Sequence, residues 1–357
     1  MSVEIDLLEI LRDANNTKKA SDIFIVAGLP LSLKVKGEII PVTEAALMPD
    51  DTAKIIKEIY ELAQNPNFEK FLETGDSDFS MSIRNIGRFR VNTYRQRGSL
   101  AAVLRIISFG LPDPETFGIP PAVIELYKKT KGLILVTGPA GSGKSTTLAC
   151  VIDAINTNRK GHIMTLEDPI EFIHNHKESI VSQREVPSDT ASYLQAIKAA
   201  LRQSPDVILV GEMRDIETIS IALTAAETGH LMLSTLHTMG AAATIDRIID
   251  IFPASQQQQI RVQLAMSLQA VVSQQLLPTV DKGLAAAFEV MICTTAVSNM
   301  IREGKLHQIN STIHTSGDVG MQTMDSSLVT LVKKGVITKE TAGIYSANPE
   351  IIARLLG

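Results

Sequence analysis

The stretches LILVT at residues 133–137 and GPAGSGKSTT at residues 138–147 decide the fold of this 357-residue chain. The first is an apolar run typical of a buried strand. The second has the spacing Gly-x-x-x-x-Gly-Lys-Ser of a phosphate-binding loop, and it lies between a strand and a helix, as such a loop requires. Glycines let the backbone wrap closely around phosphate oxygens, and the N–H groups at the helix start form an anion cradle. The sequence therefore predicts a site for ATP and Mg²⁺.

Each residue of the loop has a part in this prediction. We expect the nucleotide to contact Gly138, Pro139, Ala140, Gly141, Ser142, Gly143, Lys144, Ser145 and Thr146. Lys144 should reach the β- and γ-phosphates, and the Ser145 hydroxyl should ligate Mg²⁺. The competing interpretation is a glycine-rich turn without a ligand, and the strand, the lysine and the Ser-Thr-Thr run argue against it.

Strand-like and helix-like segments alternate around the loop. We expect strands at 133–137, 162–165, 207–210 and 230–235, helices at 144–157, 190–203 and 215–227, and mainly helix from about residue 240. Alternation of this kind predicts an α/β fold, in which a mainly parallel sheet is covered by helices on both faces.

Acidic residues follow two of these strands, and the carboxyl ends of parallel strands are where ligands bind in such folds. The strand VILV is followed by Gly211 and then by Glu212. An acidic residue usually comes directly after such a strand, but glycine occupies that position here. We therefore expect Glu212 to organise Mg²⁺ together with Ser145. Glu167 and Asp168 follow the strand that begins at residue 162, and we expect them to polarise the attacking water. The alternative for this pair is two exposed carboxylates in a turn.

Two histidines flank the strand LMLST, with His230 before it and His237 after it. A histidine at a strand end beside the phosphates can sense the γ-phosphate through a hydrogen bond. The alternative for each is a structural histidine. A shared metal site is not expected, because their spacing along a strand gives no common ligand face.

A proline-rich stretch, SFGLPDPETFGIPP at 108–121, predicts a linker, and we place the domain boundary near residue 112. The two predicted domains are therefore 1–112 and 113–357. In the first we expect strands at 23–26, 31–35, 38–42, 79–83, 87–94 and 100–107, with helices at 3–14, 50–63 and 66–74. This mixed order predicts a small α+β domain.

Residues 84–105 hold six arginines and no carboxylate: Arg84, Arg88, Arg90, Arg95, Arg97 and Arg105. Strand alternation predicts Arg88 and Arg90 on one face, with Arg95 and Arg97 on the other. The cluster can complete a nucleotide site of a neighbouring subunit, or pair with an acidic surface, or form a solvated basic face.

Composition narrows the classes of function. The net charge is −5, Trp is absent and aromatic residues make up 4%, so nucleic acid is not expected as the main partner.

The chain has two cysteines, Cys150 and Cys293, and we expect both to be small core residues and not part of a disulfide or a zinc site. No apolar run is long enough to span a bilayer, and the acidic N-terminal stretch lacks the features of a secretory signal, so we expect a cytoplasmic protein.

Four stretches in this order carry a resemblance: GPAGSGKSTT, TLEDPIEF, VILVGEMRD and TGHLMLSTLHT. Together they resemble the Walker A, Asp box, Walker B and His box segments of the secretion ATPase superfamily. GRFRVNTYRQRG at 87–98 and the stretch 300–328 extend the resemblance over nearly the whole chain. It implies a PAS-like N-terminal domain, a RecA-like P-loop ATPase domain, and a ring hexamer with ATP sites at the subunit junctions.

Residue by residue, the resemblance implies that Glu167 is the catalytic base and Glu212 the Walker B acid. It implies that His230 and His237 are the His-box histidines, and that Arg90, Arg95 and Arg97 lie near nucleotide. One departure is clear: the Ala-Ile-Arg segment of the family reads Ala296-Val297-Ser298 here. Because the arginine is missing, we expect the coupling of hydrolysis to movement through this segment to differ.

Within the superfamily, the chain is similar to the ATPases that power type IV pilus retraction and twitching motility. Pilus assembly and type II secretion relatives commonly carry a long N-terminal extension and a four-cysteine zinc loop, and this chain shows neither. The resemblance implies an inner-membrane platform protein as partner and a peripheral position at the inner face of the cytoplasmic membrane. The alternatives are an assembly or secretion ATPase, a weakly hydrolysing regulator of another pilus motor, and a DNA-transfer motor.

Overall fold

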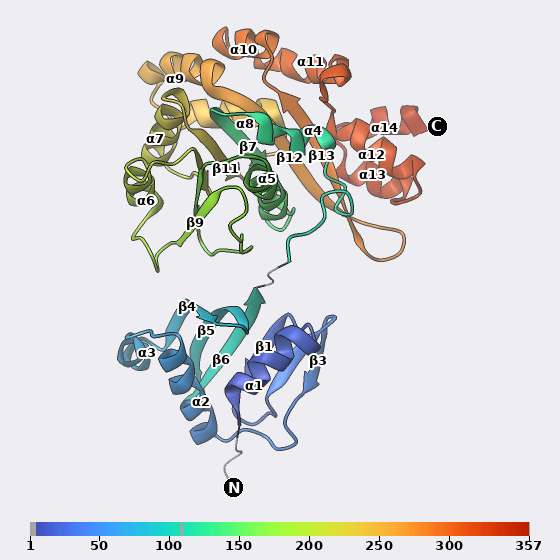
Figure 1. Ribbon diagram of the computed structural model, residues 1–357. Coiled ribbons are helices and arrows are strands. Elements are labelled where there is room, and N and C mark those ends of the chain that lie inside the picture. Colours follow the sequence, from blue (N-terminus) through green and yellow to red (C-terminus); the bar gives the residue numbers. More distant parts are fainter. Residues whose placement is uncertain (1–4, 108–109, 357) are drawn as a thin grey trace. The chain divides into compact units, whose positions relative to one another are not determined.

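The computed structural model describes residues 5–107 and 110–356, and the chain divides into two compact units (Figure 1). Unit 1 contains residues 1–110 and 171–173, and unit 2 contains the remainder. Residues 108 and 109 of the predicted linker, and the first two residues of the predicted helix 3–14, lie outside the described residues. The domain boundary near residue 112 stays a prediction.

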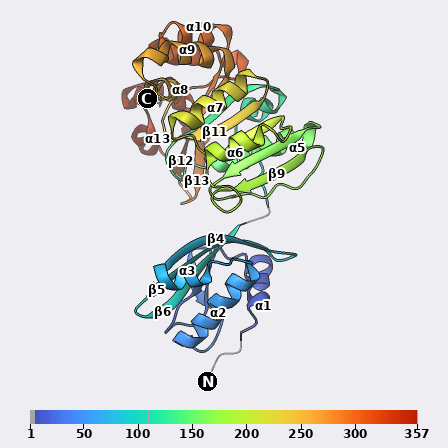
Figure 2. The same cartoon turned by 90° about the vertical axis from the view of Figure 1, so that its left-hand side faces the viewer.

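Unit 1 is an antiparallel sheet with helices on one face, in agreement with the predicted α+β domain. Its strand order is β3-β2-β1-β6-β5-β4. The strands are β1 Asp22–Ile25, β2 Ser32–Val35, β3 Glu38–Pro41, β4 Asp76–Ile83, β5 Gly87–Gln96 and β6 Ser99–Ile107, and the helices are α1 Leu7–Arg12, α2 Pro49–Leu62 and α3 Phe68–Thr74. Figure 2 shows α2 lying across the sheet, and Ile56 and Ile59 of α2 belong to the same buried core as Phe89 and Val91 of β5.

Unit 2 is built on a seven-stranded sheet of order β13-β12-β7-β11-β10-β8-β9. The strands are β7 Gly132–Thr137, β8 His162–Glu167, β9 Ile180–Glu185, β10 Val207–Val210, β11 Leu231–Leu236, β12 Leu268–Pro278 and β13 Leu284–Ile292. All neighbours pair in parallel except β12 and β13, which form an antiparallel hairpin. The predicted α/β fold with a mainly parallel sheet is therefore confirmed.

Alternate residues of the central strand face two separate cores. Leu133 and Leu135 pack with α6, α7 and α9 on one side, and Ile134 and Val136 pack with α4 and α5 on the other. Figure 2 shows α6 and α7 over the first face. A strand buried on both faces has to be apolar throughout, which is why LILVT shows no alternation with polar residues.

The helices of unit 2 fill both faces and one end of the sheet. They are α4 Pro121–Ile124, α5 Lys144–Asn158, α6 Tyr193–Ala200, α7 Ile216–Glu227, α8 Ala241–Asp250, α9 Ala254–Ser267, α10 Thr295–Arg302, α11 Ile309–Thr315, α12 Met324–Lys333, α13 Lys339–Tyr345 and α14 Pro349–Leu356. The last three gather beside β12 and β13 around a small core of their own (Figure 1). Within the described ranges, no helix has both the length and the hydropathy that a membrane span needs.

The prediction of mainly helix beyond residue 240 is wrong for residues 268–292, which form β12 and β13, and β9 was not predicted. Segment 255–275 is rich in glutamine, which resembles an exposed helix, but Gln274 and Gln275 are buried in β12. Gln274 Oε1 accepts from Thr147 at 2.7 Å and Gln275 Nε2 donates to the carbonyl oxygen of Tyr345 at 3.3 Å, and a pattern based on local polarity does not detect such distant contacts.

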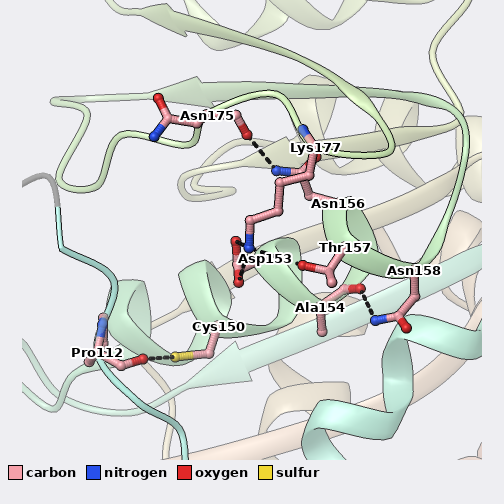
Figure 3. Close-up of polar contacts among 9 residues, drawn as sticks. All are labelled: Pro112, Cys150, Asp153, Ala154, Asn156, Thr157, Asn158, Asn175 and Lys177. Atoms are coloured by element: carbon pink, nitrogen blue, oxygen red, sulfur yellow. Dashed lines mark hydrogen bonds and ion pairs between the residues drawn. The ribbon is translucent and has the colours of Figure 1, made fainter.

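Helix α5, which begins at the loop, is held from the side by the segment that leads into β9 (Figure 3). The buried Asn156 donates from Nδ2 to the carbonyl oxygen of Asn175 at 2.7 Å and accepts from the backbone N–H of Lys177 at 3.2 Å. The Lys177 ammonium bonds Asp153 at 2.8 Å and Thr157 at 3.0 Å. These contacts fix the orientation of α5 and hence of the loop at its start.

We predict that Asn156→Ala destabilises unit 2 by about 1–3 kcal/mol, because it leaves two backbone groups without their partner. For a domain of this size the melting temperature should fall by about 2–8 °C, measured by differential scanning calorimetry. Asn158→Ala is the matched control, since the exposed Asn158 bonds only the carbonyl of Ala154 in its own helix. Equal melting temperatures for the two variants would contradict this account.

Candidate functional site

The loop between β7 and α5 takes a course that only glycine permits at two positions. Gly138 has φ +141°, and a Cβ there would lie 2.2 Å from the backbone carbonyl oxygen of Gln274. Gly143 has φ +86°, and a Cβ there would lie 2.8 Å from the ring of Phe117. Because Gln274 lies on β12, the neighbouring strand sets how closely the loop passes over the sheet.

Lys144 lies inside the loop at the first position of α5, where its side chain is buried. Its ammonium donates to the carbonyl oxygens of Gly138 at 3.0 Å and Pro139 at 2.9 Å. The positive charge is therefore placed within the cradle that the sequence predicted. Ser145 and Thr146 follow in the first helical turn, half-buried.

Three buried polar atoms around the loop have no hydrogen-bond partner among the described residues. They are Thr137 Oγ1 at the end of β7, Ser142 Oγ in the loop and Gln274 Nε2 on β12. Unsatisfied buried donors are costly, and all three can donate to an anion. This cluster is an observation of the fold, independent of the motif, that fits phosphate oxygens in the loop.

Parallel register brings three predicted residues to the same edge of the sheet as the loop. Thr137 pairs with Leu236, and Val210 pairs with both Ser234 and Leu166. The residues that follow these strands therefore emerge together: the loop after β7, His237 after β11, Glu212 after β10, and Glu167 at the end of β8.

Glu212 and His237 are in contact. His237 Nε2 lies 3.4 Å from Glu212 Oε2, and the same oxygen accepts from Arg214 Nε at 2.7 Å. The Glu212 side chain is mostly buried, while those of Arg214 and His237 are exposed. Arg214 was not among the predicted residues, although it lies within the Walker B stretch.

Glu167 is held by two donors on one oxygen. Its Oε1 accepts from Thr165 Oγ1 at 2.6 Å and from Gln183 Nε2 at 3.3 Å. Gln183, on β9, also accepts the backbone N–H of His174 at 2.8 Å. No sequence pattern pointed to Gln183, because β9 itself was not predicted.

Tyr193, at the start of α6, lies close to three of the acidic residues at this edge of the sheet. Burial raises the pKa of its phenol, and the nearby carboxylates of Asp168, Glu212 and Glu167 raise it further. A Cβ on Gly211 would lie 2.8 Å from the Tyr193 hydroxyl oxygen. The glycine in the place of the usual acid is thus explained by the tyrosine packed against it.

The structure does not bring His230 to this site. His230 precedes β11, its carbonyl oxygen accepts from the N–H of Gly132 at the start of β7, and its ring Nδ1 lies 3.1 Å from the carbonyl oxygen of Ala225. It lies at the amino-terminal edge of the sheet, one strand length or about 20 Å from His237. Within unit 2 it has the contacts of a structural histidine.

The arginines of unit 1 are only partly arranged as predicted. Arg90 makes a two-point pair with Asp78 on β4, with distances of 3.2 and 2.7 Å, and Arg105 pairs with Asp22 at 2.9 Å, so carboxylates from other strands offset part of the charge. Arg95 donates to the carbonyl oxygen of Leu72 at 2.8 Å. Arg97 does not share a strand face with Arg95, because it lies in the two-residue turn between β5 and β6 with φ +50°.

The oxygen donors at this edge fit Mg²⁺ bound together with a nucleotide. Mg²⁺ is usually held by one or two protein oxygens, substrate phosphates and waters, and Ser145 and Glu212 supply such oxygens. Among the described residues, no cluster of three His, Cys, Asp or Glu side chains could hold a metal ion without a nucleotide.

Burial raises the pKa of the Cys150 thiol to about 11, so this cysteine stays protonated at neutral pH, as expected of a core residue.

The fold and the site together define a P-loop ATPase with a mainly parallel sheet and a preceding α+β unit. Residues 1–342 match the family described as type II/IV secretion system protein. The chain belongs to this family.

Two curated relatives and one solved structure cover nearly all of the chain. It is 46% identical over 347 residues to the type IV pilus retractation ATPase PilT of Pseudomonas aeruginosa, which covers 97% of this chain and 99% of that protein. It is 43% identical over 349 residues to a twitching motility protein of Neisseria gonorrhoeae, covering 98% and 92%. The crystal structure of the pilus retraction motor PilT with bound ADP superposes with a TM-score of 0.90 at 47% identity, covering 98% of this chain and all of that one.

We predict that Gln274→Leu weakens ATP binding about tenfold, because it removes the amide that bonds Thr147 Oγ1 at 2.7 Å beneath the loop. Gln275→Leu is the matched control, since the adjacent Gln275 is also buried but bonds the carbonyl oxygen of Tyr345 at 3.3 Å. Titration calorimetry with ATP and Mg²⁺ measures both variants. An equal effect of the two substitutions would show that Gln274 acts on general stability and not on the loop.

Proposed function

We propose that this chain is a Mg²⁺-dependent ATPase motor that powers type IV pilus retraction, and thereby twitching motility. The observation that carries the proposal is the meeting of the phosphate loop with Glu167, Glu212 and His237 at one edge of a sheet. The near-full-length similarity to PilT supports retraction as the process that is driven.

In this proposal the loop amides and Lys144 neutralise the phosphates, and Ser145 and Glu212 hold the metal. Bound Mg²⁺ offsets charge on the β- and γ-phosphate oxygens. Glu167 orients the attacking water and accepts its proton, while Thr165 and Gln183 hold the carboxylate in place through Oε1. His237 contacts the γ-phosphate from beside Glu212, so its contacts differ before and after hydrolysis.

We further propose that the active form is a ring of six copies, as the resemblance to the secretion ATPase superfamily implies. In this ring, Arg95 and Arg97 from one copy approach the phosphates bound by another. Arg97 suits this role because it is exposed at the tip of a hairpin. Arg90 joins them only if its pair with Asp78 opens. The ring would work against a pilus platform protein at the inner face of the cytoplasmic membrane.

Deletion of the gene tests the direction of force. We predict that deleted cells carry excess surface pili and do not twitch, and that a chromosomal Glu212→Gln allele gives the same phenotype. The purified Glu212→Gln protein should bind ATP but release phosphate at least about 100-fold more slowly than the wild type.

The control is Glu217→Gln, which removes an exposed carboxylate on α7 and should leave both pili and turnover unchanged. Cells without pili would instead indicate an assembly motor. ATP binding without turnover by the wild-type chain would indicate a regulator of another pilus ATPase.

Mixing experiments test the shared site. We predict that Arg97→Ala and Lys144→Ala chains are each inactive alone, because each lacks one half of every site. Mixed and reassembled, they should recover part of the phosphate release, since some junctions then combine an intact loop with an intact arginine. Failure of every mixture to recover activity would place the whole site within one chain.

A further inference from the structure

The chain segment between β11 and α8 carries His237, and it has to pass the end of β7. In the sheet β7 lies between β11 and β12, whereas α8 begins beside β12 and β13. The segment thus starts on one side of the strand that leads into the phosphate loop and ends on the other. Gly138, the first residue of the loop, donates its N–H to the carbonyl oxygen of Leu236 at 3.2 Å. The contacts of residues 237–241 therefore determine how His237 lies beside the loop.

Two side chains on β12 and β13 hold the far end of this segment. The N–H of Gly240 donates to Ser273 Oγ at 2.9 Å, and the N–H of Ala241 donates to Glu289 Oε1 at 2.8 Å. Ser273 and Glu289 are partners in the register of the two strands, and Ser273 is also the partner of Thr137 at the end of β7. Both acceptors therefore lie in one row with the start of the phosphate loop.

Glu289 is itself fixed from two directions. Burial raises the pKa of its carboxyl group, and the N–H groups of Ala241 and Met324, the first residues of α8 and α12, oppose this rise. The chain just before α12 is bonded to β13 in both directions, because Val290 and Gln322 exchange N–H···O bonds of 2.8 and 3.1 Å. The oxygen that accepts from Ala241 thus has a defined position.

The residues between His237 and these anchors are bonded as well. Gly240 has φ +84°, and a Cβ there would lie 3.6 Å from Glu289 Oε1. Thr244 Oγ1, in the first turn of α8, donates to the carbonyl oxygen of Gly240 at 2.7 Å and lies 2.8 Å from Thr238 Oγ1. The residue next to His237 is therefore connected to the start of α8, and through it to Ser273 and Glu289.

We propose that Glu289 and Ser273 are positioning residues of the nucleotide site, which hold His237 where it meets the γ-phosphate. This inference rests on the proposed ATPase function and gives a role to two residues on the opposite side of β7 from the catalytic carboxylates. The His237 side chain is exposed and its polar contact is with Glu212 at 3.4 Å, so its place depends on the backbone that carries it. A segment ordered in advance lowers the entropy lost when ATP binds.

The test compares ADP with a non-hydrolysable ATP analogue on the full chain by titration calorimetry, each with Mg²⁺. Glu289→Met keeps the length of the side chain and removes the acceptor. It should weaken binding of the analogue about 5- to 20-fold and leave ADP binding within about twofold, because only the analogue carries a γ-phosphate.

Ser273→Ala should show the same selective loss, and it decides the question if Glu289→Met does not fold. The matched control is Ser327→Ala. It removes a hydroxyl that also bonds a backbone N–H of this sheet, that of Phe288 at 3.1 Å, but that does not contact residues 237–241. The control should bind both nucleotides as the wild type does.

A double-mutant cycle with His237→Ala separates positioning from general support of the fold. If Glu289 and Ser273 act through His237, their substitution in the His237→Ala chain should weaken analogue binding no further. The inference is overturned by equal losses for both nucleotides, by a loss that persists in the His237→Ala chain, or by unchanged analogue binding in the single variants. A wild-type chain that binds neither nucleotide would instead overturn the ATPase function itself.

Discussion

The parallel register of β7, β11, β10 and β8 is the constraint on which the site depends. Parallel strands paired without slippage end at one edge, and residues up to 100 positions apart in sequence then converge there. No direct contact between the loop and the acidic residues is required for this, because each is the continuation of its own strand. Apolar side chains on both faces of every central strand hold the register.

In addition to the strand register, hydrogen bonds of buried polar side chains give the site a defined shape. Gln274 on β12 bonds Thr147 in the first turn of α5, Gln183 on β9 bonds Glu167, and Asn156 connects α5 to the segment before β9. Each is an amide, which can donate and accept at once without the cost of burying a charge. The amides of β9 and β12 thus lie on either side of the strands whose ends carry the loop and the acidic residues.

Much of the fold could be predicted from local patterns, and the errors have a common cause. The apolar strands, the loop and helix α5 were expected where they lie, since each is specified by its own composition. β9 and β12 were missed because their polar residues Gln183, Gln274 and Gln275 make contacts with partners distant in sequence. The pairing of Arg90 with Asp78 was missed for the same reason, since the carboxylate belongs to a different strand.

The sequence by itself determined the chemistry of this protein: a glycine-rich loop with its lysine and serine, and carboxylates that follow buried strands. These features are local, since the backbone freedom of glycine and the hydrogen bonds of a helix start need no distant partner. Only the tertiary structure decided that His237 reaches Glu212 while His230 lies a strand length away, and that Gln274 and Phe117 border the loop. Such neighbours follow from strand order and packing, which depend on the whole chain at once.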